Sequence, residues 1–284
     1  MPEPVQMADT PHQLQDAARE RESAAADHLS RVNGTFGLHA AVLALLLPAG
    51  SRRAACAWQV ETQAMPGAAA LREHVEHLSP AVRLPWLDTL LVRMRGQPLA
   101  ARQALLESTR RVMAARRVVR PLDRLHWLLM RQRLGESSAA AAHVAAHTDL
   151  LRLPQGDVSA IARYSAFLSR MVPVETGEPA DASAGTAWYT TVMARWEPHA
   201  VIPPCEPPDT DGLVHALQVL QALAWMQRPV LARDWVSAAH QHSLHGRLTD
   251  TAADALRLSC ALLDSPLPPD LERHYQTAGA QVAR

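Results

Sequence analysis

The chain contains no lysine, because all 28 of its basic residues are arginine. A Walker-type phosphate loop, a Schiff-base enzyme and a Ser-Lys hydrolase each need a lysine ammonium group, so these three classes are excluded. Arginine and lysine both carry a positive charge, and a GC-rich genome favours arginine codons. We therefore interpret the missing lysine as a property of the genome and not as a functional adaptation.

Aromatic residues are scarce, at 4% of 284 residues, whereas hydrophobic residues reach 48% and include much alanine and leucine. These two residue types favour helices over strands. The composition predicts an all-α protein with enough apolar surface for one large core or two smaller ones. The seven tryptophans form no repeated motif, and we expect them to pack in the core and between subdomains.

Cysteine is also sparse, with Cys56, Cys205 and Cys260 far apart and in no CxxC pair. This spacing argues against a disulfide scaffold and against a cysteine-rich zinc site. We expect reduced thiols that pack as small apolar residues in a cytosolic protein.

No hydrophobic run is long enough to cross a bilayer. The most apolar stretch, residues 36–47, ends at Pro48 and is shorter than the roughly 20 residues that a spanning helix needs. It predicts a buried helix. The first thirty residues contain acids and arginines and lack the apolar core of a signal peptide. We expect a cytoplasmic location, with the inner face of the membrane and peripheral membrane association as open alternatives.

The formal net charge is zero, so no global field attracts nucleic acid, which we do not expect as a partner. The strongest local charge feature is a group of arginines that includes Arg116, Arg117, Arg120 and Arg124. The spacing of Arg116, Arg120 and Arg124 predicts a basic stripe on one helix, able to bind phosphates, anionic head groups or an acidic partner. The alternative is a solvated helix whose arginines pair with acids elsewhere in the fold.

Three groups of histidines have spacings that could suit a metal ion. His143 and His147 are four residues apart, His74 and His77 are three apart, and His240, His242 and His245 form the densest group. Each group lacks a full set of nearby ligands, and His240 and His242 would point to different faces of a helix. We interpret all of them as surface histidines and expect neither a metal nor a cofactor, with a metal-binding module using residues 240–245 as an alternative.

Motifs of hydrolytic enzymes are missing as well. A zinc peptidase of the HExxH type needs a glutamate directly after its first histidine, and no histidine in the chain is followed by glutamate. No GxSxG motif is present to place a nucleophilic serine. The sequence therefore predicts a protein without a catalytic centre.

Proline and glycine divide the chain into segments. We predict helices over residues 14–29, 158–171, 213–226 and 229–242, and a further helix that ends near Leu263 with Asp250 or Thr251 as its N-cap. The predicted organisation is a polar N-terminal segment (1–33), a first helical subdomain (34–135), connecting helices (136–197), a Pro-rich linker (198–212), a second helical subdomain (213–274) and a tail (275–284).

Three short strings give the chain a resemblance to a known family: residues 36–47 (FGLHAAVLALLL), 83–88 (RLPWLD) and 263–269 (LDSPLPP). Their order and spacing resemble the C-terminal region of bacterial membrane zinc metallopeptidases of the M48 family, the Ste24/HtpX-like proteins. In that family, the region is a helical cytoplasmic extension with TerB-like segments. The resemblance covers about residues 30–271 and excludes the peptidase domain.

The resemblance implies two TerB-like subdomains, each with an acidic Asp-Gly-Arg turn before a helix that carries an acid. Here the second turn is His245-Gly246-Arg247 with Asp254 later, and the first is Arg116-Arg117-Val118 with Asp123 later, so the leading acid is replaced in both. We expect a non-catalytic scaffold or regulatory protein that acts through protein contacts, with a membrane metallopeptidase as the implied partner. The alternative is a divergent remnant or separated tail of such a peptidase.

Overall fold

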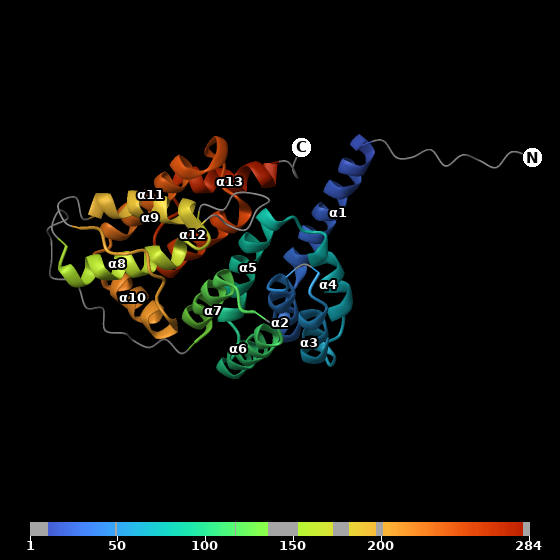
Figure 1. Ribbon diagram of the computed structural model, residues 1–284. Coiled ribbons are helices and arrows are strands. Elements are labelled where there is room, and N and C mark those ends of the chain that lie inside the picture. The colour runs from blue at the N-terminus through green and yellow to red at the C-terminus, as the bar shows by residue number, and fades with distance from the viewer. Residues whose placement is uncertain are drawn as a thin grey trace, which may run out of the picture. The chain divides into compact units, whose positions relative to one another are not determined.

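The structure is a computed structural model that describes residues 11–48, 50–116, 118–135, 153–172, 182–196 and 201–280. Within these residues it contains thirteen α-helices, one short 3-10 helix and no strand (Figure 1). The predicted all-α fold class is confirmed.

Contacts between residues divide the chain into two compact units, one of residues 1–115 with 276–284 and one of residues 116–275. The predicted linker at residues 198–212 lies inside the second unit. Helix α10 begins inside this segment, at Thr210, and packs against α8, which precedes the segment. The prediction of two subdomains joined by this linker is therefore not confirmed.

The first unit is built around helix α2, which packs against α3, α4, α5 and α6, while α1 packs against α4. All side chains from Leu38 to Leu45 are buried, which confirms a buried helix over most of the apolar stretch, whereas Phe36 near its start is 64% exposed. The indole Nε1 of Trp58 on α3 donates to the carbonyl of Ala40 on α2 at 3.3 Å. The helices of this unit are α1 (Pro11–Arg31), α2 (Gly34–Leu45), α3 (Arg52–Thr62), α4 (Ala68–Glu76), α5 (Pro80–Arg95) and α6 (Leu99–Ala114).

Local sequence explains where these helices begin. Pro80 occupies the first turn of α5, where its missing N–H costs no hydrogen bond. Gly67, with φ of 74°, adopts the left-handed conformation just before α4, which only glycine adopts without strain. Ser51 caps α3, because its hydroxyl accepts from the N–H of Ala54 at 3.3 Å.

The second unit packs α7 against α12, α8 against both α9 and α10, and α11 against α9 and α12. Its core contains the fully buried Trp188, Trp235, Tyr164 and Phe167. Its helices are α7 (Pro121–Leu134), α8 (Gln155–Leu168), α9 (Ala182–Trp196), α10 (Thr210–Ala222), α11 (Gln227–His242), η1 (Leu244–Gly246), α12 (Asp250–Leu262) and α13 (Pro269–Ala280), the last as far as Tyr275.

The turn between α11 and α12 differs from the prediction in its cap. His245 and Gly246 both have positive φ, of 53° and 67°, and reverse the chain. Thr249 is the N-cap of α12, because its hydroxyl accepts from the N–H of Ala252 at 3.2 Å. The prediction of Asp250 or Thr251 as N-cap was wrong by one or two residues, since Asp250 is already the first helical residue.

Among the described residues, no helix combines the length and the apolar character that crossing a bilayer requires. The three cysteines are free thiols, of which Cys260 is buried, Cys205 is partly buried and Cys56 is exposed. The expectation that all three pack as apolar residues is therefore wrong for Cys56.

Candidate functional site

The predicted basic stripe does not form one helical face. Helix α7 begins at Pro121, and Arg120 is its N-cap, so Arg116 precedes the helix that carries Arg124. The side chain of Arg116 is only 5% exposed and pairs with Asp123, whose side chain is 3% exposed. Arg120 is exposed and Arg124 partly exposed, and Arg117 lies outside the described residues. A spacing of four residues did not place these arginines on one face, because α6 ends at Ala114 and α7 begins only at Pro121.

Asp123 joins the turn to the helix. Its carboxylate binds the guanidinium of Arg116 and accepts from the backbone N–H of Arg120 at 3.0 Å. Burial alone would raise the pKa of Asp123, but Arg116 and the Arg120 N–H together lower it. Asp123 is thus an ionised residue that holds the start of α7. Arg116 pairs with an acid, as the alternative expected, but it is buried and lies outside the helix.

The histidine group at the end of α11 is separated by the fold. The Nδ1 of His240 lies 2.7 Å from the carbonyl oxygen of Gly246, and the Nε2 of His242 lies 2.7 Å from the hydroxyl of Thr191 on α9. His245 is exposed in the turn. No group of three or more His, Cys, Asp or Glu residues in the described part of the chain is placed to hold a metal ion.

Of the other two histidine pairs, the structure describes only His74 and His77. His143 and His147 lie outside the described residues. His74 on α4 stacks against His28 on α1, with ring centroids 4.2 Å apart. His77 follows α4 as an exposed C-cap residue.

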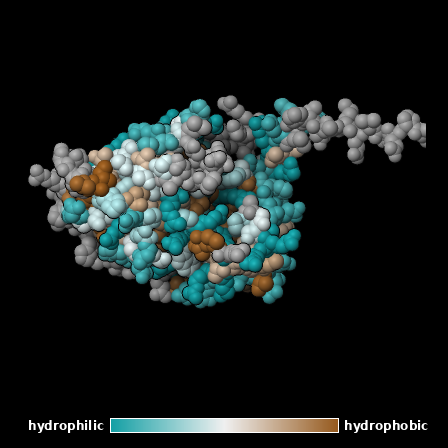
Figure 2. Space-filling view, viewed as in Figure 1, coloured by the Kyte–Doolittle hydropathy of each residue, from teal (hydrophilic) through white to brown (hydrophobic). Residues whose placement is uncertain are grey.

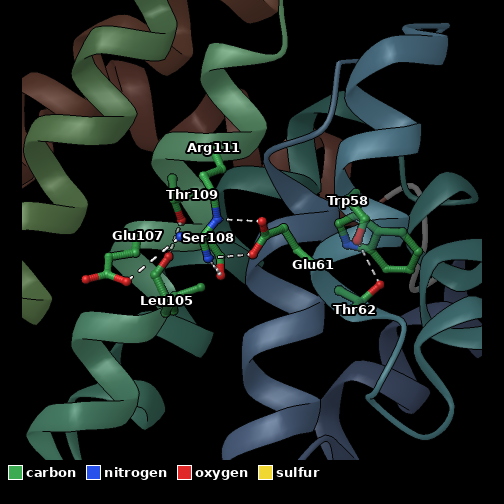
Figure 3. Close-up of polar contacts among 8 residues, drawn as sticks. All are labelled: Trp58, Glu61, Thr62, Leu105, Glu107, Ser108, Thr109 and Arg111. Carbon is green, nitrogen blue, oxygen red and sulfur yellow. Dashed lines mark hydrogen bonds and ion pairs between the residues drawn. The ribbon is translucent and has the colours of Figure 1, made fainter.

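A polar cluster lies between α3 and α6 in the first unit (Figure 3). Arg111 on α6 makes two hydrogen bonds to the carboxylate of Glu61 on α3, of 2.6 and 2.7 Å, and a third of 3.2 Å to the hydroxyl of Ser108. The two bonds to Glu61 form the fork geometry that is strongest for arginine and carboxylate. The pair therefore clamps α3 to α6.

The chemistry of this cluster does not suit proton transfer. The hydrogen bond from Arg111 lowers the pKa of Glu61, which stays ionised at neutral pH. Ser108 accepts from Arg111 and also hydrogen-bonds to Glu61, a carboxylate whose lowered pKa makes it a weak base. The buried Nε2 of His39 has no hydrogen-bond partner within the described residues. A nucleophilic serine needs a stronger base bonded to its hydroxyl. The observed bonds fit a structural clamp, which sequence reasoning missed because its two halves are 50 residues apart.

His39 should make the stability of the first unit depend on pH. Burial lowers its pKa from 6.5, with nearby Glu61 raising it and Arg111 lowering it. The unfolded chain therefore binds more protons below about pH 6.5, and stability is lost as the pH falls from that value. Between about pH 7 and pH 5.5, we expect the free energy of unfolding to fall by at most about 1.4 kcal/mol per pH unit on account of His39.

Urea unfolding of the parent chain and of His39→Leu at both pH values tests this prediction. The substitution should make the pH dependence shallower, because leucine cannot titrate. Equal pH dependence in both proteins would show that His39 is not the residue responsible. His12→Leu is the matched control, since His12 is exposed on α1.

An exposed apolar turn joins α10 to α11 in the second unit. Trp225 is 77% exposed, and Met226 and Val230 are 47% and 43% exposed. The prediction that all tryptophans pack in cores is therefore wrong for Trp225. Helix α10 ends at Ala222 and not at residue 226 as predicted, so Trp225 falls in the turn and not on the buried side of a helix.

The turn that carries Trp225 is fixed by its neighbours. The buried side chain of Gln227 accepts from the N–H of Ala224 at 3.3 Å. Arg228 donates to the carbonyls of Leu223 at 3.0 Å and Leu263 at 3.2 Å. These bonds hold both ends of the turn and present Trp225 on a rigid support.

Comparison with known proteins adds no assignment: no family model, no curated protein and no solved structure matches the chain. The resemblance to the metallopeptidase tail stays a prediction.

Proposed function

We propose that the protein is a non-catalytic helical scaffold or regulatory protein that binds another protein through the Trp225 surface, defined as Trp225, Met226, Val230 and Arg233. The observation that carries the proposal is the 77% exposure of Trp225 on a turn fixed by hydrogen bonds. A tryptophan in water leaves a large apolar area hydrated, and burial in a partner recovers that free energy. Tryptophan is also the residue type most enriched among those that dominate binding energy.

The spacing of the surface supports a single binding face. Met226 and Val230 are four residues apart, and Val230 and Arg233 are three apart, so all three lie on one side of α11. Arg233 is exposed and forms no ion pair with any described residue. The surface thus runs from an aromatic residue through two aliphatic ones to a cation. It suits an apolar groove on the partner with a carboxylate at one end.

Exposed apolar residues are also found elsewhere on the chain, for example Val118 and Val119. On the face drawn in Figure 2, apolar residues lie in separate small patches among polar ones. Single exposed apolar residues are normal on a folded protein, whereas neighbours on a rigid support favour a contact site. The resemblance of the chain to the tails of membrane metallopeptidases makes such a peptidase, encoded separately, the partner that we propose.

The test is recovery of the partner from solubilised membranes with the parent chain and with Trp225→Ser. We expect the parent to retain an M48-type peptidase and Trp225→Ser to bind it with affinity lower by about 2 kcal/mol, roughly 30-fold. The melting temperature should stay unchanged, because Trp225 is exposed. Val201→Ser, at a position that is 94% exposed in the same unit, is the matched control and should bind like the parent.

Two outcomes would contradict the proposal. Equal recovery with the parent and Trp225→Ser would show that the Trp225 surface is not the contact. Absence of the peptidase under several solubilisation conditions, with a purified M48-type peptidase also failing to bind, would remove the proposed partner.

A further inference from the structure

A cavity of about 510 Å³ lies in the first unit, where the C-terminal end of α2 and the start of α3 meet α4 and α5. Its volume falls within the range of small-molecule sites, roughly 300–1,000 Å³. Its lining contains the three arginines Arg52, Arg72 and Arg83 but only one acid, Glu76. The cavity therefore carries two more positive than negative side chains.

Arg83 is the most deeply placed of these cations. Its Nε and Nη2 donate to the carbonyls of Leu78 and Val75, each at 3.3 Å, at the C-terminal end of α4. These bonds fix the guanidinium group against the partial negative charge of this helix end but bring it no carboxylate. Burial lowers the pKa of Arg83, and Glu76 offsets this only in part. A cation that is partly desolvated and has no bonded carboxylate is stabilised by an anion in the cavity.

Arg72 and Glu76 form the only ion pair among the described residues that line the cavity, with Nε and Oε1 2.9 Å apart. The guanidinium of Arg72 also lies over the ring of Trp58, 5.5 Å from its centroid. The one acid of the cavity is thus already bonded to Arg72. It does not neutralise Arg52 or Arg83.

The start of α3 adds to the positive field. Ser51 caps this helix of eleven residues, and Arg52 occupies its first position with no acid in the first turn. The N-terminal end of a helix carries a partial positive charge and favours acids, so the guanidinium of Arg52 is repelled there. An anion at this end would relieve the repulsion and accept from the free N–H groups of the first turn.

We infer that this cavity is a binding site for the phosphoryl group of a small phosphate monoester. A phosphate dianion matches the excess of two positive charges, and its oxygens suit the planar guanidinium groups of Arg83 and Arg52. The rest of the ligand would lie against the apolar lining of Leu47 and Val75. The site lies in the first unit and is independent of the Trp225 surface.

Isothermal titration calorimetry of the full chain with glycerol 3-phosphate, and separately with inorganic phosphate, tests the inference. Arg52→Gln should weaken binding of glycerol 3-phosphate about tenfold, because one charge-assisted contact is lost. Arg53→Gln is the matched control: it makes the same change one residue away, outside the cavity lining, and should bind like the parent. Arg83→Gln should weaken binding more strongly, and Arg52→Gln, exposed at the rim, keeps the test valid if Arg83→Gln does not fold.

Vesicles of phosphatidylcholine with and without phosphatidic acid distinguish the source of the phosphoryl group. Binding of glycerol 3-phosphate that depends on Arg52 supports a soluble ligand. Binding only to the phosphatidic acid vesicles, again lost in Arg52→Gln and kept in Arg53→Gln, supports the same site with a lipid head group. No binding in either arm, or equal losses in the two variants, would overturn the inference.

Discussion

Replacing Trp235 with alanine is expected to lower the free energy of unfolding of the second unit by about 3–5 kcal/mol. The side chain is completely buried on α11. The alanine variant would leave a cavity of the size of an indole ring among well-packed helices. Such a cavity costs both the lost burial and the lost contacts of its lining.

Trp235 also belongs to a chain of polar contacts that joins four helices. Its Nε1 donates to the hydroxyl of Ser165 on α8 at 2.9 Å, and its carbonyl accepts from Nε1 of Trp188 on α9 at 3.1 Å. Its ring stacks on Tyr164, with centroids 5.5 Å apart. The hydroxyl of Tyr164 in turn donates to Ser259 on α12 at 3.1 Å. Truncation at Trp235 leaves the buried hydroxyl of Ser165 without this donor.

Thermal and urea unfolding, followed by circular dichroism, measures this effect. Trp235→Phe should lose less than Trp235→Ala, because the ring stack on Tyr164 persists while the hydrogen bond to Ser165 is lost. Trp225→Ala is the matched control and should change stability by less than about 0.5 kcal/mol, since that ring is exposed. Equal losses at the two tryptophans would refute the assignment of Trp235 to the core.

Helix type and approximate position could be predicted from sequence because they depend on local chemistry. The apolar run of α2 has no continuous polar face, and this predicted the burial that the structure shows from Leu38 to Leu45. Pro and Gly at helix ends act through their own backbone angles, as Gly67 before α4 and Pro80 at the start of α5 do. The predicted helix ends differ from the observed ones by a few residues. At α10 the predicted helix extended to residue 226, so the exposure of Trp225 was not predicted.

Contacts between distant residues could not be predicted in this way. The clamp between Glu61 and Arg111 depends on how α3 packs on α6, and neither residue has a distinctive neighbourhood in sequence. The cavity of the first unit gathers Arg52, Arg72 and Arg83 from three helices, and a count of local charge does not bring them together. The predicted basic stripe is a contrasting case, because local sequence predicted a shared face that does not form. A spacing of four residues places side chains on one face only within one continuous helix.

Replacing Asp123 with leucine is the second change with a large expected effect, a loss of about 3–5 kcal/mol in the free energy of unfolding. The substitution leaves the guanidinium of Arg116, which is buried, without its carboxylate. It also removes the acceptor for the N–H of Arg120 at the start of α7. Asp270→Leu is the control: it breaks an exposed pair with Arg273 and should cost less than about 1 kcal/mol.

The double variant Arg116→Met with Asp123→Leu separates the attraction of the pair from the cost of burying a single charge. If most of the loss in each single variant comes from the buried charge left behind, the double variant should lose only about 1–2 kcal/mol, part of it from the missing cap at Arg120. A double variant whose loss equals the sum of the single losses would show that the two side chains do not interact.

Low pH should have the same effect as the Asp123 substitution. Because the folded-state pKa of Asp123 is lowered, its stabilisation is present above about pH 4 and is lost as the pH falls further through the folded-state value.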